Sequence, residues 1–461
     1  MALETLVAFA IIAGIILVGF FGELIFRRFR IPSVLILLAT GYMLGPVTGI
    51  VDVDMMVGLQ YLFAPLALMI LLFDGGIQLN IYRLVHESSR GILLGVFGLL
   101  FSIAAVAGIW MMLGNDLITG LLIGAIVSGT GSAIVIPIAR GMDLSEKARQ
   151  TLTIESSVTD VVSVVLVLSL TGALISGHAT IEGTTQNVVA SFSIGAVLGG
   201  VFGMAWINLS DKLRKLNFYY MLTLAIMLVL YIVTEFMVGS GAIAVLVFGI
   251  MLGNMGEIGK MLRFRDVMEE PKMAQFQDEI SFLVRTFFFV FLGIIVSISS
   301  IDVVVLGVGI TFVLLAARQV SVWLSTAGSD LAEYRKEIGV LMPRGLATAI
   351  MATYPATVLL ENAGIIGYSQ FGTLYREVSV FPQVGFVVIV ASIVITTLGV
   401  MMAGGEGRHA GSRGEEREDG LDEEVKEEAA KKRKLRERIE QEKKRVEIQE
   451  TVEEGEEDEG A

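Results

Sequence analysis

The sequence predicts an all-α polytopic membrane protein with about 13 transmembrane helices, and three observations support this fold class. Of the 461 residues, 54% are hydrophobic and the mean hydropathy is +0.73, which is more apolar than a soluble fold can bury. Apolar runs of about 20 residues, long enough to cross a hydrocarbon core of about 30 Å as a helix, recur almost to residue 403. The alternation typical of transmembrane strands is absent, so a barrel is not expected.

The apolar segments follow one another with polar connections between them. They lie at 4–26, 32–50, 58–79, 90–114, 116–138, 149–175, 187–208, 217–236, 239–255, 278–298, 301–324, 337–361 and 381–403. The first six and the last six begin on opposite sides of the membrane, with the seventh as a connector. This order predicts two inverted six-helix repeats.

Lysine and arginine are distributed unevenly between the two sets of connections. One set holds nearly all of them, from Arg27 to Lys336, whereas the opposite set holds only Arg376. The positive-inside rule assigns the first set to the cytoplasm. We therefore expect a multi-pass protein of the cell membrane with its N-terminus outside and its C-terminus in the cytoplasm, and an odd number of spans fits this orientation.

The composition changes abruptly at residue 404. Residues 404–461 contain few apolar side chains but hold 21 of the 47 acidic residues and 13 of the 34 basic ones, so most of the formal net charge of −13 lies there. Opposite charges at helical spacing are typical of a solvated helix. We interpret residues 1–403 as a transmembrane domain and 404–461 as a charged cytoplasmic tail that is helical or disordered.

The sixth segment carries two acids, Glu155 and Asp160, within an apolar sequence. Asp160 lies about 15 Å deep when counted from Gln150 at 1.5 Å per residue, near the bilayer midplane. Ser156 is four residues earlier on the same helix face, so its hydroxyl and the Asp160 carboxylate can converge on one small cation, and Thr159 has the same spacing from Glu155. An ionisable group at this depth indicates an ion or proton site.

The fifth segment contains the sequence SGTGSA at 128–133, also near mid-depth. Gly129 and Gly131 flank Thr130, and Ser132 follows, a pattern that predicts an interrupted helix whose freed carbonyl groups line a cavity. Close helix packing by small residues is an alternative reading of equal weight.

The twelfth segment is the repeat partner of the fifth. It contains Gly345, Thr348, Thr353 and Pro355, which predict a second interruption there. Two interrupted helices would then cross at the midplane beside Asp160, as alternating access to a central ion requires.

Two arginines, Arg318 and Arg344, lie within apolar segments. Arg318, in the eleventh segment, reaches a depth similar to that of Glu155, so we expect a structural ion pair that leaves Asp160 unpaired and titratable. Arg344 stands at the start of the twelfth segment, where snorkelling to the interface is the simplest interpretation, and its function is left open.

Several motifs in order resemble one family, the monovalent cation:proton antiporters, and in particular the prokaryotic sodium/proton exchangers. The resemblance covers roughly residues 1–403 and leaves out the tail. Its motifs are LFDGGIQL at 72–79, GAIVSGTGSAIVIP at 124–137, ESSVTD at 155–160, RTFFFVFLG at 285–293, Arg318 and PRGLA at 343–347.

The resemblance implies roles for the residues that match these motifs. Asp160 would bind the cation and the proton in competition, with Ser156 and Thr130 as further ligands of Na⁺, while Glu155 and Arg318 form a structural pair. The resemblance also implies a homodimer in which 90–175 and 301–403 form a moving core, while 1–79 and 217–298 form a scaffold that carries the dimer contact. Membrane lipid, monovalent cations and protons are the other expected partners, with no resident cofactor and no nucleic acid.

This chain departs from the family pattern at two places. Electroneutral members typically have Asn-Asp, and electrogenic members Asp-Asp, where this chain has Thr159-Asp160. Many members have Thr-Asp-Pro where this chain has Thr130-Gly131-Ser132. Because one carboxylate is left, we expect electroneutral exchange of one proton per monovalent cation, with Na⁺ as the expected cation and K⁺ as the alternative.

Other functions are weighed against antiport. A K⁺ efflux system or channel could use the same scaffold, but the sequence contains no selectivity-filter signature and no ligand-binding soluble domain. An intramembrane aspartyl protease needs two facing aspartates, and the only other candidate, Asp74, lies at the end of the third segment, where a turn or cap is expected. We therefore expect a transporter and not an enzyme.

Overall fold

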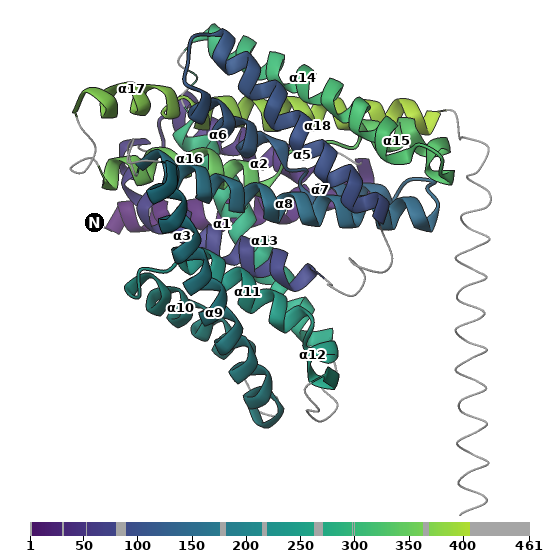
Figure 1. Ribbon diagram of the computed structural model, residues 1–461. Helices are drawn as coiled ribbons and strands as arrows, with labels where there is room; N and C mark the ends of the chain where they lie inside the picture. Colours follow the sequence, from purple (N-terminus) through teal and green to yellow (C-terminus); the bar gives the residue numbers. More distant parts are fainter. Residues whose placement is uncertain are drawn as a thin grey trace, which may run out of the picture. The chain divides into compact units, whose positions relative to one another are not determined.

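The computed structural model describes residues 2–29, 32–51, 53–79, 89–175, 181–213, 219–261, 271–296, 298, 300–362 and 368–405. All regular secondary structure in this part of the chain is helical, which confirms the all-α fold class (Figure 1). The tail from residue 406 onward lies outside the described residues, so its predicted helical or disordered state stays a prediction.

The helices follow the apolar segments closely. Their bounds are α1 Ala2–Phe29, α2 Ser33–Tyr42, the π-helical turn η1 Met43–Val47, α3 Val53–Gln78, α5 Ser89–Met112, α6 Leu117–Ser128, α7 Ser132–Arg140, α8 Glu146–Ile175, α9 Ile181–Leu213, α10 Tyr219–Phe236, α11 Gly241–Gly253, α12 Met255–Met261, α13 Pro271–Ile295, α14 Ile301–Thr326, the 3₁₀ turn η2 Asp330–Tyr334, α15 Arg335–Val340, α16 Leu346–Glu361, α17 Tyr368–Val378 and α18 Phe381–Gly405. The helices α12 and α17 and the 3₁₀ turn η2 fall in polar connections between the predicted apolar segments.

The described residues contain seven helical stretches that are long and apolar enough to cross a membrane. Shorter apolar helices accompany them at Phe9–Ile25, Ser33–Val47, Phe63–Gln78, Gly241–Gly253 and Leu346–Glu361. The chain is therefore a multi-pass membrane protein. The count of thirteen spans and the inverted repeats stay predictions.

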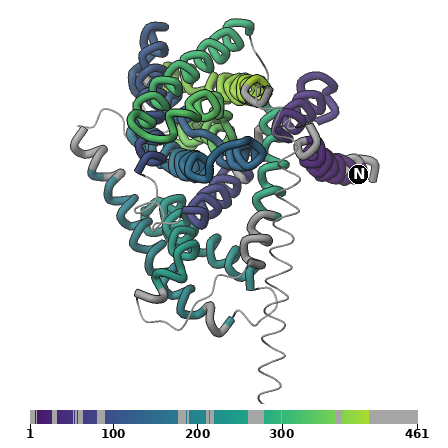
Figure 2. Tube along the Cα trace, turned by 90° about the vertical axis from the view of Figure 1, so that its right-hand side faces the viewer, coloured from purple at the N-terminus to yellow at the C-terminus, as the bar shows by residue number. Residues whose placement is uncertain are grey.

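Helices α9, α10 and α11 pack with α3 around a core of their own. Phe73 of α3 stacks on Phe248 of α11, with ring centroids 5.8 Å apart, and Met227 and Leu230 of α10 are fully buried in the same cluster. Figures 1 and 2 show α9 to α12 gathered together on one side, with α14, α15, α17 and α18 on the opposite side.

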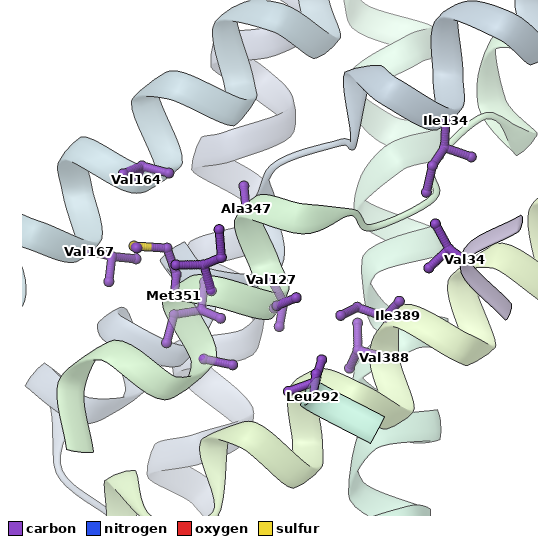
Figure 3. Close-up of a cluster of buried hydrophobic side chains, with 14 of the residues drawn as sticks. Val34, Val127, Ile134, Val164, Val167, Leu292, Ala347, Met351, Val388 and Ile389 are labelled. Atoms are coloured by element: carbon purple, nitrogen blue, oxygen red, sulfur yellow. The ribbon is translucent and has the colours of Figure 1, made fainter. Parts of the chain in front are cut away.

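A larger apolar core joins the helices on the other side. Figure 3 shows part of it, with buried side chains from α6, α7, α8, α16 and α18 converging with Val34 of α2 and Leu292 of α13. The labelled residues are Val34, Val127, Ile134, Val164, Val167, Leu292, Ala347, Met351, Val388 and Ile389. Several of these residues adjoin the ends of α6, α7 and α16, so the polar groups at those ends lie in apolar surroundings. A hydrogen bond there is electrostatically stronger than it would be in water.

A carboxylate on α17 holds the start of α6. Glu377 Oε2 accepts a hydrogen bond from the buried Thr119 hydroxyl and a second from the Asp116 backbone N–H at 3.3 Å. Thr119 also accepts the indole N–H of Trp110 at 3.1 Å. The short helix α17 is thereby fixed to the beginning of one of the central helices.

We expect Glu377→Ala to lower the free energy of unfolding by about 1 kcal/mol, because it removes the hydrogen bonds that join α17 to the start of α6. Glu377→Gln is the matched control, since its amide oxygen can still accept both hydrogen bonds. Thermal unfolding in detergent measures the difference. Equal melting temperatures for Glu377→Ala and the unsubstituted protein would contradict this role.

Candidate functional site

Two helices are interrupted, and the interruptions lie in the fifth and twelfth apolar segments. The first lies between α6 and α7, where Gly129 and Gly131 are extended, with φ/ψ of −65°/139° and −67°/103°. The second lies at 341–345, between α15 and α16. Of the two readings of SGTGSA, the structure therefore has the interrupted helix.

Of the four predicted positions, Gly345 lies at the second interruption, whereas Thr348, Thr353 and Pro355 do not. Thr348 and Pro355 lie inside α16, which runs unbroken from Leu346 to Glu361. Proline removes only one intrahelical hydrogen bond, and a well-packed helix can continue through it. The break falls instead at Pro343-Arg344-Gly345, because the residue before a proline disfavours helical geometry and glycine leaves the backbone free.

The two interruptions touch each other. The Gly131 N–H donates a hydrogen bond of 2.9 Å to the carbonyl of Pro343. A Cβ atom on Gly131 would lie 2.9 Å from the Gly345 Cα and 3.0 Å from the Gly345 nitrogen. The backbones of the two interruptions are therefore in direct contact at this crossing, and only glycine fits between the two segments.

We expect Gly131→Ala to force the two backbones apart and to destabilise the protein by roughly 1–3 kcal/mol, the usual cost of overpacking. Gly98→Ala in α5 is the control, because a Cβ atom there meets nothing within 4 Å. The measurement is the detergent unfolding temperature of both variants. If Gly131→Ala unfolded at the same temperature as Gly98→Ala, the contact would be less tight than described.

Opposite charges stand at the two helix ends of the first interruption. Asp160 of α8 accepts, at its Oδ2 atom, the Ser132 backbone N–H at 2.9 Å and the Ser132 hydroxyl at 2.8 Å, both at the start of α7. Arg344 donates from Nη1 to the carbonyls of Ser128 and Gly129, at 2.6 Å and 2.8 Å, at the end of α6. A helix N-terminus favours a negative charge and a C-terminus a positive one, so the two side chains complement the two helix dipoles.

Arg344 does not snorkel to the membrane surface, so that expectation is wrong. Its side chain is 2% exposed, and its backbone N–H donates to the Ser392 hydroxyl at 3.0 Å. The signal that could have located it is the Pro343-Arg344-Gly345 sequence itself, since proline and glycine two residues apart are a strong helix breaker. A cation in such a break can reach the carbonyls that another broken helix leaves free.

Glu155 and Arg318 lie in contact beside the crossing. Two hydrogen bonds join them, Nη1 to Oε1 at 2.9 Å and Nη2 to Oε2 at 3.3 Å, and both side chains are almost fully buried. Arg318 also donates to the Ile338 carbonyl at the end of α15. The Thr130 hydroxyl donates to Glu155 Oε1 at 2.9 Å, so the pair is joined to the first interruption.

The remaining predicted ligands make contacts other than with Asp160. The Thr130 and Thr159 hydroxyl oxygens are 3.0 Å apart, and the Thr130 N–H donates to Thr159 Oγ1 at 3.3 Å. The Ser156 hydroxyl donates to the Thr153 carbonyl at 3.2 Å. Ser132, predicted only as part of the interruption, is the residue that contacts the Asp160 carboxylate.

The site thus offers oxygen atoms in a confined, mainly apolar region. Asp160 is half-buried, and its Oδ1 atom accepts no hydrogen bond from the described part of the chain. The hydroxyl oxygens of Ser132, Ser156 and Thr159 keep lone pairs for a further partner. Such a set suits a proton or a small hard cation better than a transition metal.

Comparison with known proteins finds relatives that are named as cation/proton antiporters. The chain is 29% identical over 351 residues to a K(+)/H(+) antiporter NhaP2 of Shewanella sp. (strain ANA-3), covering 73% of this chain and 58% of that protein. It is 28% identical over 258 residues to a probable Na(+)/H(+) antiporter 2 of Methanocaldococcus jannaschii, covering 54% of this chain and 60% of that protein. This chain therefore spans less than two thirds of the length of either relative.

A solved structure, that of the sodium proton antiporter MjNhaP1 from Methanocaldococcus jannaschii at pH 8, has a similar fold. Its TM-score is 0.70 at 21% identity, over 87% of this chain and 98% of that one. The family model for the transmembrane sodium/hydrogen exchanger matches residues 11–403. The chain belongs to the sodium/hydrogen exchanger family.

Proposed function

We propose that this protein exchanges a monovalent cation for H⁺ across the cell membrane, with Asp160 as the site at which the two compete. The observation that carries the proposal is the position of the Asp160 carboxylate at the start of α7, in the interruption that Arg344 closes from the other side. Membership of the sodium/hydrogen exchanger family supports it. The transported cation is cargo and not a resident cofactor.

Competition at one carboxylate gives a coupling mechanism. An ionised Asp160 can hold a dehydrated cation through Oδ1, with Ser156, Thr159 and Thr130 as further oxygen donors, whereas a protonated Asp160 is neutral and holds a cation weakly. If only the two loaded forms can change the side to which the site opens, cation and proton move in opposite directions. Exchange is then obligatory.

Stoichiometry and cation follow from the same site. One titratable carboxylate gives one proton per monovalent cation, and so transport without net charge movement. Na⁺ is the first candidate, and K⁺ is the second because the NhaP2 relatives are named K(+)/H(+) antiporters. The two candidates share the mechanism and differ only in the ion that fits.

The wider arrangement belongs to the same proposal. Residues 90–175 and 301–403 are the moving core, 1–79 and 217–298 are the scaffold, and two copies of the chain associate through the scaffold. The apolar cluster shared by α3, α10 and α11 supports the grouping of these three helices within the scaffold. The N-terminus is outside and residues 404–461 are in the cytoplasm, as the distribution of Lys and Arg indicates.

Purified protein in liposomes tests the proposal. A pH-sensitive dye inside the vesicles reports proton movement when Na⁺, Li⁺ or K⁺ is added outside, with and without a clamped membrane voltage. We expect a cation-driven pH change that voltage does not alter. A cation current without a pH change would contradict antiport and favour a channel.

A further inference from the structure

Ser132 is the residue at the site whose role neither the family match nor the proposed function assigns. We propose that it is a positioning residue that favours the ionised form of Asp160 and so sets the pH range of exchange. The inference rests on the proposed function for its consequence in transport, but its direct effect on the carboxylate can be measured without transport.

Both donors of Ser132 converge on one oxygen of Asp160. The backbone N–H lies 2.9 Å from Oδ2, and the hydroxyl oxygen lies 2.8 Å from the same atom. The N–H groups in the first turn of a helix have no partner within the helix, so this one is free to bind the carboxylate. The hydroxyl adds a second donor from the same residue.

Two donors on one oxygen favour the charged carboxylate over the protonated one. Hydrogen bonds to an ionised acceptor are roughly twice as strong as those between neutral groups. Because both bonds use Oδ2, the Oδ1 atom is left for the proton or the cation. Ser132 therefore makes protonation harder without covering the atom at which the exchange takes place.

Other charged groups near Asp160 influence its ionisation equally in every variant at position 132. Glu155, on α8 itself, opposes a second negative charge but is neutralised by Arg318 of α14. Arg344, from the interruption at 341–345, favours a negative charge. A comparison among variants of Ser132 thus isolates the two hydrogen bonds.

The backbone at this position accepts a graded set of substitutions. Ser132 is the first residue of α7, where proline fits well, and Gly131 has a φ/ψ of −67°/103°, the conformation that a residue before proline prefers. Ser132→Pro removes both donors, Ser132→Ala removes only the hydroxyl, and Ser132→Thr keeps both. The unsubstituted chain and Asp160→Asn complete the series.

The first readout is the ionisation of the carboxyl group at equilibrium. A protonated carboxyl group gives an infrared C=O band, and the band that is missing in Asp160→Asn belongs to Asp160. The intensity of this band is measured as a function of pH in each purified full-length variant. We expect the midpoint to rise by about one pH unit in Ser132→Ala, the shift that loss of one charge-assisted hydrogen bond gives, and further in Ser132→Pro. Ser132→Thr should titrate like the unsubstituted protein.

The second readout is exchange in liposomes with whichever of NaCl or KCl drives the unsubstituted protein. The pH of half-maximal exchange should rise in the same order as the infrared midpoint. At acidic pH, the apparent KM for the cation should rise up to about tenfold in Ser132→Ala, as a shift of one pH unit implies. At alkaline pH, the KM should return to the unsubstituted value, because Asp160 is then ionised in every variant at position 132.

Three results would overturn the inference. An infrared midpoint that is the same in Ser132→Ala and Ser132→Pro as in the unsubstituted protein would show that Ser132 does not act on the carboxyl group. A KM that stays raised at alkaline pH would make the hydroxyl a cation ligand instead. A loss of kcat that is equal at every pH would reduce Ser132 to a structural role. If the midpoints shift as expected but the unsubstituted protein does not exchange ions, the effect of Ser132 on the carboxyl group stands, while the proposed function fails and with it the consequence for the pH of exchange.

Discussion

Replacing Asp160 with asparagine should reduce cation-driven proton movement to the level of liposomes that contain no protein. Asparagine has nearly the same shape, and its amide oxygen can still accept the two hydrogen bonds from Ser132, so the contact between α8 and α7 is kept. What is lost is the only group at the crossing proposed to carry the proton. The protein should fold, and its unfolding temperature should stay close to that of the unsubstituted chain.

The measurement is dye-reported exchange in liposomes together with unfolding in detergent, on the same protein preparation. Asp302→Asn, at an exposed acid in the first turn of α14, is the control and should leave exchange unchanged. Exchange that persists in Asp160→Asn with an unchanged cation dependence would remove Asp160 from the mechanism.

The second large effect is expected at the buried ion pair. Arg318→Ala leaves Glu155 charged and buried, and Glu155→Ala leaves Arg318 in the same condition. Each single change should destabilise the protein by about 3–5 kcal/mol, the usual cost of orphaning a buried charge. The double replacement by alanine should cost less than the sum of the two single changes, because neither charge is then left alone.

An exposed pair provides the comparison. Lys147 and Asp330 lie 3.2 Å apart, with side chains 60% and 90% exposed, and Lys147→Ala should cost no more than about 1 kcal/mol. Urea or thermal unfolding in detergent measures all four variants. Stable Glu155 and Arg318 single variants with a shifted cation dependence would make Glu155 part of the ion site and not a structural partner.

The helices could be predicted from the sequence because lipid imposes one strong rule. Every backbone polar group must be satisfied within the span, so an apolar run of sufficient length has to be helical. The same rule explains why SGTGSA at 128–133 could indicate a broken helix. Depth along a helix follows from residue number alone, and this is why counting from both sides of the membrane could bring Glu155 and Arg318 together.

Depth alone does not fix what a side chain contacts. Ser156 lies on the same helix face as Asp160, yet its hydroxyl donates to the Thr153 carbonyl of its own helix. Serine in a helix commonly bonds back to the preceding turn, and a spacing of four residues cannot exclude this. The contact between Ser132 and Asp160 joins two different helices, so it depends on how α7 and α8 pack.

The second interruption shows a related limit. Pro355 is a helix breaker by composition, but packing keeps it within α16, whereas Pro343-Arg344-Gly345 forms the break because Gly345 has to meet Gly131. The sequence offers several candidate positions for the break, from Gly345 to Pro355, and contact with the other interrupted helix decides among them. The buried position of Arg344 follows from that choice.

Proton release on cation binding, measured at equilibrium in detergent, tests the central claim most directly. Na⁺ or K⁺ is added to weakly buffered protein at a pH where the Asp160 carboxyl is protonated, and the released protons are counted against the cations bound. Competition at one carboxylate predicts one proton released for each cation bound, and none in Asp160→Asn. Cation binding without proton release, or equal release from Asp160→Asn, would contradict it.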